Sequence, residues 1–329
     1  MQLSIIIINF NTFKLTCECI DSIKEHTPGL SYEIIVVDNA PKADYQQDFL
    51  SLYPDLVYIK SQENIGFGRA NNLGMDVAKG DYFLLINSDT VVVGNCINQC
   101  YDFMEQPTSQ HIGVVGCKLL NEDGSYQPSF YPYVHDTIWN YFITNNPILY
   151  KLLKVSDKYR ETDETIQVGD ISGAYMFMRA DVVKKVKGFD PDFFLYCEET
   201  EWCRSRIAKH YDIYYYPEPK TVHYGGKSAP REPMYIQSKL SLALVWYKKG
   251  WGSYLLYFLA TYANLFFYAL TYYLTSAENR APAKQYIRGH LKIFPYLFSD
   301  VIKYPRGYNC RKEHLVYGGA REIFFGKKK

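Results

Sequence analysis

The chain has 329 residues, which is enough for one large domain or two ordinary ones. Its 36 basic and 35 acidic side chains give a net charge of +1, so nothing indicates a nucleic-acid partner or an acidic tail. The eight cysteines form no CxxC pair, which argues against a zinc site of usual spacing and favours reduced, mostly buried thiols in a cytosolic protein.

The first ninety residues predict strands that alternate with helices. The expected strands are 3–8, 33–37, 56–59 and 82–86, and the expected helices are 12–25, 44–52 and about 64–78. Strand–helix alternation with β-branched strands is typical of a parallel sheet that helices cover on both faces. The sequence therefore predicts an α/β fold with a doubly wound, mostly parallel sheet.

The middle of the chain is less regular. A strand is expected at 113–120, and residues 121–165, rich in Tyr, Pro and Asn, predict a long, partly structured excursion. Order is expected to return as a strand at 171–179, helices at 181–186 and 198–209, a strand at 213–216 and a glycine-containing loop at 221–228.

Near the C-terminus, residues 251–277 contain no charged side chain. Lys248 and Lys249 precede this stretch, and Arg280 and Lys284 follow it. Its length suffices for a membrane span, but its many tyrosines prefer the bilayer interface. With basic flanks, an interfacial or re-entrant helix is the favoured interpretation, and a full span or a buried helix of a soluble subdomain are the alternatives.

Polar residues follow four of the predicted strands. Asn9 and Asn11 follow the first, Asp38 the second, the glycine-rich segment 64–74 the third and Asp89 the fourth. Each is also typical of a turn. In open α/β sheets, however, ligands bind at the carboxyl ends of strands, where an aspartate can hold a divalent cation that neutralises a diphosphate.

The glycine-rich segment could approach a phosphate. Gly66 and Gly68 stand at a predicted helix start, where backbone N–H groups bind anions, and Arg69 could add charge. The spacing resembles part of a dinucleotide fingerprint, but it follows the third strand rather than the first. The alternative is a helix start capped by Asn64.

Two further groups could carry chemistry. Glu198, Glu199 and Glu201 open a predicted helix after an aromatic run, where a carboxylate beside apolar rings can gain a raised pKa and act as a base. Acidic residues are also ordinary partners of a helix dipole. His223 precedes two glycines and could complete a metal site that Asp89 begins.

Taken in order, these motifs resemble the inverting nucleotide-sugar glycosyltransferases of family 2, which have the GT-A fold. Within that family they are similar to the bacterial rhamnosyltransferase-like enzymes of cell-surface polysaccharide assembly. The resemblance covers roughly residues 1–230. It rests on eight segments in one order: 4–11, 34–39, 64–74, 84–89, 172–176, 188–194, 198–199 and 222–228.

The resemblance implies a role for each matching position. Asp38 would bind the nucleobase, Asp89 would contact Mg²⁺ or Mn²⁺ where the family has its DxD motif, and His223 would be the second metal ligand. Residues 64–72 would line the nucleotide pocket. The implied nucleotide-binding residues are Asn9, Asn11, Asp38, Asn64, Gly66, Arg69, Asn72, Asn87 and Ser88.

The catalytic base is implied at Glu199, where the subgroup usually has the Asp of a Glu-Asp pair. Glutamate is longer by one methylene, so either the acceptor sits further away or Glu198 shares the role. Gly173 and Ala174 are the expected acceptor contacts.

The implied activity is an inverting, metal-dependent hexosyl transfer from a nucleoside-diphosphate sugar to a hydroxyl of a glycan acceptor. The resemblance favours dTDP-rhamnose or a UDP-sugar as donor and a polyprenyl-linked glycan as acceptor. We expect a GT-A domain at 1–230 and a helical, aromatic-rich, membrane-associating region at 231–329. The first apolar run, 3–8, is too short for a signal peptide, so the expected location is cytoplasmic, peripheral on the inner face of the cell membrane.

Two other functions fit parts of the pattern. A nucleotidyltransferase would share the sheet and metal, but it should carry a basic glycine-rich loop after the first strand, where this chain has Asn9–Phe13 without glycine. A non-catalytic nucleotide-sugar-binding scaffold or partner subunit would fit the departure at Glu199. Asp89, His223 and the acidic helix start argue against that scaffold.

Overall fold

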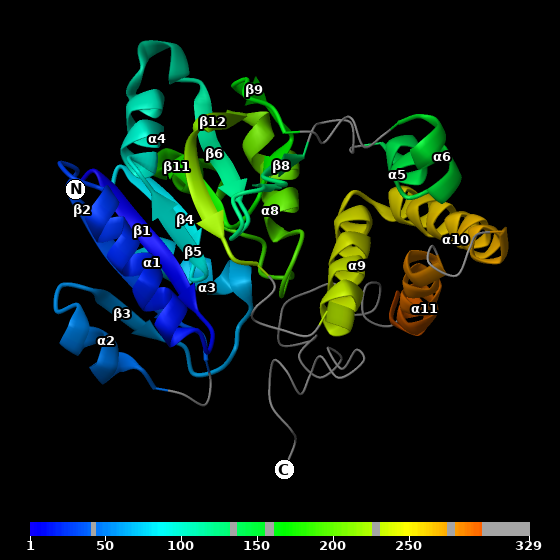
Figure 1. The fold of residues 1–329 in the computed structure, drawn as a ribbon, viewed down its shortest axis with the longest axis horizontal. Helices are drawn as coiled ribbons and strands as arrows, with labels where there is room; N and C mark the ends of the chain where they lie inside the picture. Colours follow the sequence, from blue (N-terminus) through cyan, green and yellow to red (C-terminus); the bar gives the residue numbers. More distant parts are fainter. Residues whose placement is uncertain (41–43, 132–136, 155–160, 226–230, 275–279, 298–329) are drawn as a thin grey trace. The chain divides into compact units, whose positions relative to one another are not determined.

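The computed structural model describes residues 1–40, 44–131, 137–154, 161–225, 231–274 and 280–297. The chain divides into two compact units, and Figure 1 shows the course of each. Unit 1 comprises Met1–Tyr131, Glu161–Phe194 and Glu198–Ser228. Unit 2 comprises Pro132–Arg160, Leu195–Cys197 and Ala229–Lys329.

Unit 1 is built on one large sheet with the strand order β3-β2-β1-β4-β11-β6-β12-β5. These strands are β1 (Leu3–Asn9), β2 (Tyr32–Asp38), β3 (Val57–Lys60), β4 (Tyr82–Asn87), β5 (Thr90–Val93), β6 (Ile112–Leu120), β11 (Tyr175–Arg179) and β12 (Asp212–His223). Short strands extend it: β7 (Tyr126–Gln127) pairs with β6, and β9 (Ile166–Gln167) pairs with β12. A separate pair consists of β8 (Phe130–Tyr131) and β10 (Asp170–Ile171).

The N-terminal half of the sheet is parallel, as the sequence predicts. Strand β1 runs parallel to β2 and to β4, and β2 runs parallel to β3. All seven residues of β1 are buried, because both faces of the strand are covered. The predicted α/β fold with a mostly parallel, doubly wound core and a C-terminal helical extension is confirmed.

Helices cover both faces of the sheet (Figure 1). On one face, Leu3, Ile5 and Ile7 share a core with α1 (Phe13–His26), α2 (Gln46–Leu52) and α4 (Cys96–Glu105). On the other, Ile6 and Ile8 share a core with α3 (Phe67–Val77) and α7 (Ala180–Val186). Successive strand side chains point to opposite faces, so one apolar strand contributes to both cores. A short 3-10 turn, η1 (Pro107–Ser109), follows α4.

The C-terminal half of the sheet is mixed, and two predicted elements differ there in detail. Strand β11 is antiparallel to both β4 and β6. The predicted helix at 198–209 is present over these bounds, but its type changes along the segment, from a short α8 (Glu198–Glu201) to a π-helical turn η4 (Trp202–Arg206) and a 3-10 turn η5 (Ile207–Lys209).

The predicted loop at 221–228 is also partly wrong, since β12 continues to His223. Pro217 and Pro219 interrupt the expected strand signal because proline donates no ladder hydrogen bond, and the register of β12 shifts between Tyr215 and Lys220 to accommodate them. Residues 226–230 lie outside the described part of the chain.

Unit 2 is helical where it is described. Its helices are α5 (Ile138–Thr144), α6 (Pro147–Leu152), α9 (Arg231–Lys248), α10 (Trp251–Leu274) and α11 (Arg280–Tyr296). The excursion expected at 121–165 therefore contributes short strands to unit 1 and two helices to unit 2. The domain boundary at residue 230 stays a prediction. Among the described helices, α10 is long and apolar enough to cross a membrane by length and composition.

Gly66, at the start of α3, cannot be replaced without strain. Its φ is 88°, and an added Cβ would lie 2.3 Å from the carbonyl oxygen of Phe194. Gly124 has a similar φ of 79° but open space around it. Both Gly→Ala variants lose about 1 kcal/mol from the left-handed backbone, and Gly66→Ala should lose more because Phe194 must move. Urea unfolding of the two variants measures this, and equal losses would contradict the proposed contact.

Candidate active site

The carboxyl ends of the parallel strands bring three predicted site residues to one edge of the sheet. The register pairs Asn9 of β1 with Asp38 of β2, and Ile8 of β1 with Asn87 of β4. This edge is where open α/β sheets bind ligands.

The Asp38 carboxylate lies at the centre of a hydrogen-bond network in which both of its oxygens accept hydrogen bonds. Its side chain is buried, and Oδ1 accepts from Asn9 Nδ2 at 2.9 Å and from Ala40 N at 3.3 Å. Its Oδ2 accepts from Tyr58 OH at 2.7 Å and from Lys60 Nζ at 2.8 Å. Burial and the Asp38 contact raise the pKa of Tyr58, which keeps the phenol a donor. A nucleobase that binds this carboxylate must replace one of the donors.

The start of α3 is shaped by two asparagines. Asn39 Nδ2 donates to Asn64 Oδ1 at 2.9 Å, and the same oxygen accepts from Gly66 N at 3.0 Å. Asn39 Oδ1 accepts from Ile65 N at 2.9 Å. The predicted site residue Asn64 therefore holds the loop conformation, with its side chain buried. Because this loop fixes Gly66, it also fixes the first backbone N–H groups of α3.

Other predicted nucleotide-binding residues also bind the protein backbone. Arg69 Nε donates to Pro191 O at 2.8 Å. Asn72 donates to Phe189 O at 2.9 Å and accepts from Phe189 N at 2.8 Å. These contacts tie α3 to the segment that precedes Glu198 and Glu199. Asn11, in contrast, is exposed with a left-handed φ of 58°.

Asp89 and His223 meet at the junction of β4 and β5. Strand β12 pairs His223 with Thr90, the residue after Asp89, and Tyr224 N donates to Asp89 O at 2.9 Å. His223 Nε2 consequently lies 3.3 Å from Asp89 Oδ1. Both side chains are largely buried, with 16% and 9% of their surface exposed, so the protein holds them in place.

Gln127 sets the tautomer of His223. Its Nε2 donates to the backbone O of His223 at 3.2 Å and to Asn121 Oδ1 at 3.0 Å, which leaves Oε1 as the atom that faces the ring. His223 Nδ1 is 2.6 Å from that Oε1 and must donate to it. Whenever the ring carries a single N–H hydrogen, its lone pair is then on Nε2, which lies 3.2 Å from Asn87 Nδ2.

The Asp89–His223 pair fits two neighbouring ligands of a divalent cation. Two adjacent octahedral ligands at about 2.1 Å from an ion are roughly 3 Å apart, close to the observed 3.3 Å. Within the described ranges no group of three His, Cys, Asp or Glu side chains could hold a metal, so phosphate oxygens and water would supply the other ligands.

Ser88 directly follows the last residue of β4. It is buried, and its Oγ lies 2.9 Å from Thr12 Oγ1, at the N-terminal end of α1. Thr12 in turn donates from N and Oγ1 to Asn9 Oδ1, at 3.2 Å in both cases. This links the fourth strand end to the first.

Gly173 and Ala174 lie between the Asn87 strand end and Glu199. Asn87 N donates to Ala174 O at 3.1 Å. A Cβ built on Gly173 would be 3.4 Å from the ring of Phe67 and 3.9 Å from the carboxyl carbon of Glu199. The two residues predicted to contact the acceptor therefore adjoin both the strand end and the predicted base.

Glu198 and Glu199 differ in their access to solvent. Glu198 is buried, and its Oε2 accepts no hydrogen bond from any described residue. Burial and the nearby Glu199 charge raise the pKa of Glu198 well above its usual range, which favours its protonated form. Glu199 is partly exposed, and burial followed by the Asp170 charge raises its pKa to about 7. Glu199 alone of the pair can be both ionised and accessible.

The remaining carboxylates of this segment are paired with arginines. Asp170 is buried and accepts from Arg204 Nε at 2.8 Å and from Thr200 Oγ1 at 2.7 Å. Glu201 Oε2 accepts from Arg206 Nη2 at 2.8 Å. These ion pairs anchor both sides of the short helix that carries Glu199.

The sequence did not identify four supporting residues. Tyr58 and Lys60 alternate along β3, a period-2 signal that places both on one face. Gln127 and Asp170 belong to strands of two residues, too short to show a pattern. Their roles come from pairing across the fold, which the local sequence does not encode.

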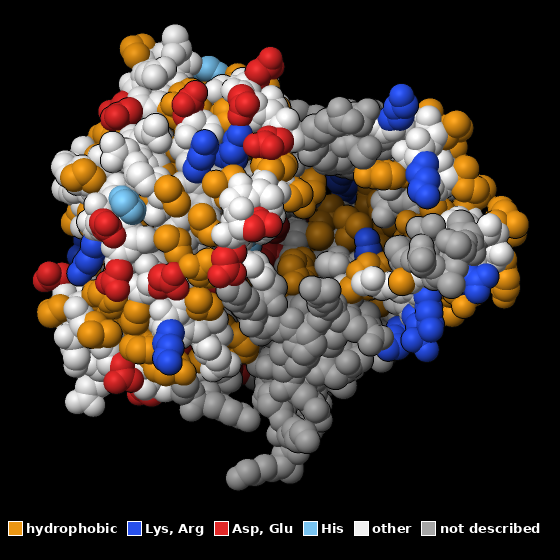
Figure 2. All heavy atoms as spheres, viewed as in Figure 1, with side chains coloured by type: hydrophobic (Ala, Val, Ile, Leu, Met, Phe, Trp, Pro, Cys, Tyr) orange, Lys and Arg blue, Asp and Glu red, His pale blue; other side chains and the backbone are white. Residues whose placement is uncertain are grey.

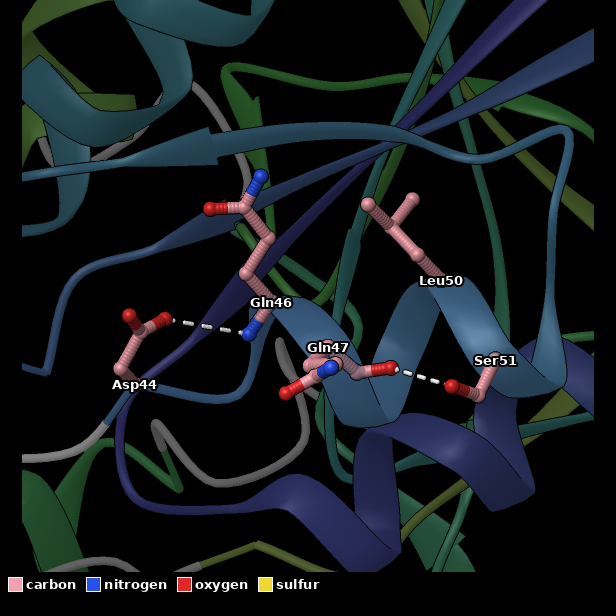
Figure 3. Close-up of a pocket in the computed structure, with 5 residues that line it drawn as sticks. All are labelled: Asp44, Gln46, Gln47, Leu50 and Ser51. Carbon is pink, nitrogen blue, oxygen red and sulfur yellow. Dashed lines mark hydrogen bonds between the residues drawn. The ribbon is translucent and has the colours of Figure 1, made fainter.

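A surface pocket over α2 is a different feature (Figure 3). Asp44, Gln46, Gln47, Leu50 and Ser51 line it. Gln46 N donates to Asp44 Oδ1 at 3.1 Å and Ser51 Oγ to Gln47 O at 2.7 Å. These are local helix contacts, and no residue predicted for the site lines the pocket.

Comparison with known proteins identifies the family. The family model of glycosyl transferase family 2 matches residues 4–187. The chain belongs to this family. A solved mannosyltransferase of the archaeon Pyrobaculum calidifontis, in complex with GDP-Man and Mn²⁺, has the same fold: its TM-score is 0.54 at 16% identity, with 99% of this chain and 88% of the other covered.

Two curated relatives share parts of this family 2 chain. The Rhamnosyltransferase WbbL of Escherichia coli is 27% identical over 203 residues, which are 59% of this chain and 73% of the relative. The Poly(ribitol-phosphate) beta-glucosyltransferase of Bacillus spizizenii is 32% identical over 114 residues, which are 33% of this chain and 18% of the relative. The match therefore spans less than a fifth of the Bacillus enzyme.

The buried Asp170–Arg204 pair should be essential for the stability of this family 2 domain. Asp170→Asn removes the buried carboxylate charge that binds Arg204, which is only 6% exposed, so the free energy of unfolding should fall by about 3–5 kcal/mol. The control is Asp181→Asn, whose partner Lys184 is exposed, and its unfolding free energy should match wild type. Equal effects in denaturant unfolding would show that burial of the pair is not what matters.

Proposed function

We propose that this protein is an inverting, metal-dependent glycosyltransferase. It moves a hexosyl group from a nucleoside-diphosphate sugar to a hydroxyl of a glycan acceptor in bacterial cell-surface polysaccharide synthesis. Family membership and the similarity to the Escherichia coli rhamnosyltransferase and the Bacillus glucosyltransferase support the reaction class.

One observation carries the proposal most directly. The Gly173–Ala174 segment contacts the Asn87 strand end on one side and adjoins Glu199 on the other. A leaving-group site at Asp89 and His223 and a base at Glu199 would thus serve one substrate position. Direct displacement needs the leaving group and the nucleophile on opposite faces of one carbon, and two separate groups of side chains could serve these two roles.

Glu199 would act on the acceptor. Its carboxylate takes the proton of the acceptor hydroxyl as the oxygen forms a bond to the anomeric carbon. The bond between that carbon and the diphosphate oxygen breaks, and its electron pair leaves with the diphosphate. Attack from the opposite face inverts the configuration, and the proton remains on Glu199. The raised pKa of Glu198 favours its uncharged form, which adds no charge that opposes this proton transfer.

Asp89 and His223 would hold Mg²⁺ or Mn²⁺, which supplies Lewis-acid stabilisation of the departing diphosphate. Gln127 would keep the Nε2 lone pair of His223 directed at the ion by accepting the Nδ1 hydrogen. Asp38, Asn64 and Gly66 would form the nucleotide end of the site. The bound Mn²⁺ of the archaeal mannosyltransferase agrees with this cofactor class.

The acceptor would be a polyprenyl-linked glycan, and the protein would work from the cytoplasm at the inner face of the cell membrane. The uncharged helix α10 supports this location, because its composition suits a membrane interface. A scaffold that binds nucleotide sugars without turnover is the competing function. Slow donor hydrolysis without acceptor distinguishes the two, because only an enzyme catalyses it.

The two glutamates should differ sharply in mutants. Glu199→Gln should lower kcat by about 10²–10⁴-fold with donor affinity retained, because it removes the general base. Glu198→Gln should change kcat little, because it replaces an already neutral carboxylic acid with a neutral amide. Steady-state kinetics with nucleotide-sugar binding as a second readout measures both. A larger loss of kcat for Glu198→Gln than for Glu199→Gln would assign the role of general base to Glu198.

The rate should depend on the ionisation of Glu199. Its raised pKa of about 7 means that the active carboxylate form is lost as the pH falls below 7. We expect kcat to drop about tenfold per pH unit on that side and to level off above it. A pH–rate profile tests this. An acidic limb that persists in Glu199→Gln would belong to another group.

The metal site can be tested without turnover. Gln127→Met should weaken Mn²⁺ affinity by about 10–100-fold, since it removes the acceptor that fixes His223. Asp89→Ala should weaken it more. Gln46→Met, an exposed change of the same kind on α2, is the control. Electron paramagnetic resonance of free Mn²⁺ in titrations with a nucleoside diphosphate gives the affinities. Unchanged affinity in Asp89→Ala would remove that residue from the site.

A further inference from the structure

Helix α10 of unit 2 has its apolar face on the outside. At 100° per residue, its large exposed apolar side chains fall within an arc of roughly 140°. They are Trp251, Leu255, Leu256, Leu259, Phe266, Leu270, Tyr273 and Leu274, between 36% and 79% exposed. Its buried residues are Tyr254, Tyr257, Thr261 and Asn264. A water-soluble helix shows the opposite arrangement.

Hydrogen bonds within unit 2 fix this orientation. Thr261 Oγ1 lies 2.8 Å from the hydroxyl of Tyr141 on α5. Asn264 Oδ1 accepts from Asn146 Nδ2 at 2.9 Å, and Asn264 Nδ2 donates to Phe142 O at 3.1 Å. Rotation of the helix to hide its leucines would break these buried hydrogen bonds. The outward apolar face is therefore a built feature, and a patch of this kind marks an interaction surface.

Helix α11 adds positive charge beside that face. Arg280, Lys284, Arg288 and Lys292 recur every four residues, and all four are exposed. The sequences of α10 and α11 contain no acidic residue. Figure 2 shows hydrophobic and basic side chains next to each other in the region of these two helices.

The two helices are packed together. The rings of Tyr268 and Tyr286 stack with centroids 3.9 Å apart, and Tyr262 OH donates to His290 O at 3.2 Å. Tyr254 OH donates to Leu297 O at 2.9 Å near the other end of the pair. The contacts run along both helices, so α10 and α11 must move as one body.

We propose that α10 and α11 together form a monotopic membrane-binding surface, one that binds an anionic membrane without spanning it. The apolar face of α10 lies in the plane of the interface and enters the boundary between headgroups and acyl chains, and the basic side chains of α11 bind lipid phosphates. A spanning α10 is disfavoured, because it would draw the charges of α11, exposed on every turn, into the hydrocarbon.

Charge favours an anionic lipid surface over a second copy of this chain as the occupant of the exposed α10 face. A symmetric dimer through α10 would bring two basic rows together with no acidic residue on either helix to balance them. An anionic leaflet supplies the complementary charge and covers the leucines at once. This inference rests on the membrane location proposed above and deepens it by naming the lipid class and the residues that bind it. Its test measures membrane binding rather than turnover, so it can fail while the transferase reaction stands.

The test is sedimentation of the full chain with vesicles of phosphatidylcholine, with and without phosphatidylglycerol. Wild type should bind the anionic vesicles and not the neutral ones. The triple variant Lys284→Gln/Arg288→Gln/Lys292→Gln should bind roughly fivefold more weakly per side chain removed, on the order of 100-fold in total. The triple variant Leu255→Gln/Leu259→Gln/Phe266→Gln should lose binding to a similar or greater degree.

Matched controls lie on unit 1. Lys184→Gln/Lys185→Gln/Lys209→Gln removes three exposed lysines, and Leu52→Gln/Val77→Gln/Val93→Gln replaces three exposed apolar residues. Both should bind as wild type does. Circular dichroism melts confirm that every variant is folded, which the exposure of the replaced residues predicts.

Several results would overturn the proposal. Binding to neutral and anionic vesicles alike would exclude the basic row as a lipid contact. Retention on vesicles after alkaline carbonate extraction would show that α10 spans the membrane instead of lying in its interface. Absence of vesicle binding together with a concentration-dependent dimer in light scattering, lost in the apolar triple variant, would assign the face to a second copy.

Discussion

The hydrogen bond from Asn87 N to Ala174 O joins the two halves of the sheet at the point where the chemistry is expected. On one side, β4 continues the parallel half, whose strand ends carry Asn9 and Asp38. On the other, β11 pairs antiparallel with β4 and brings Gly173 beside Glu199. Since β4 belongs to both halves, a shift of its register would separate the Asp89–His223 pair from Glu199.

Around this junction the fold uses its buried polar groups to hold side chains still. Asp38 is saturated with four donors, and Asp170 binds Arg204 and Thr200. Such fully satisfied networks rigidify a site. Glu198 is the exception, a buried acid without a partner for Oε2, and it shares a four-residue helix with the more accessible Glu199. This contrast in accessibility between neighbours in one helix is the reason for proposing Glu199, rather than Glu198, as the base.

The sequence predicts the parallel half of the fold well, because each β-branched strand such as β1 is a continuous apolar run closed by a polar residue. It also indicates Asp38, Asp89, Glu199 and His223 through their order along the chain. The roles of Tyr58, Gln127 and Asp170 could not be predicted, since each depends on a hydrogen-bond partner at least 20 residues away along the chain.

The failures have similar causes. The two prolines of strand β12 hide its strand pattern in the sequence. The π-helical turn after Glu201 begins at Trp202, which is fully buried with its ring tilted against that of Phe189, a long-range contact that local propensity does not reveal. The outward apolar face of α10 was visible in the sequence only as an uncharged stretch. Which side faces outward is decided by Thr261 and Asn264, whose partners lie on α5 and before α6.

The central claim is that a divalent cation and a nucleoside diphosphate bind together at the Asp89–His223 end of the sheet. Thermal unfolding with a panel of nucleoside diphosphates and sugar nucleotides, with and without Mn²⁺, tests it most directly, because a ligand of the native state raises the unfolding temperature. The account predicts an increase with one nucleotide family that requires Mn²⁺ and is lost in Asp89→Ala. No increase with any nucleotide in the presence of Mn²⁺ would contradict it.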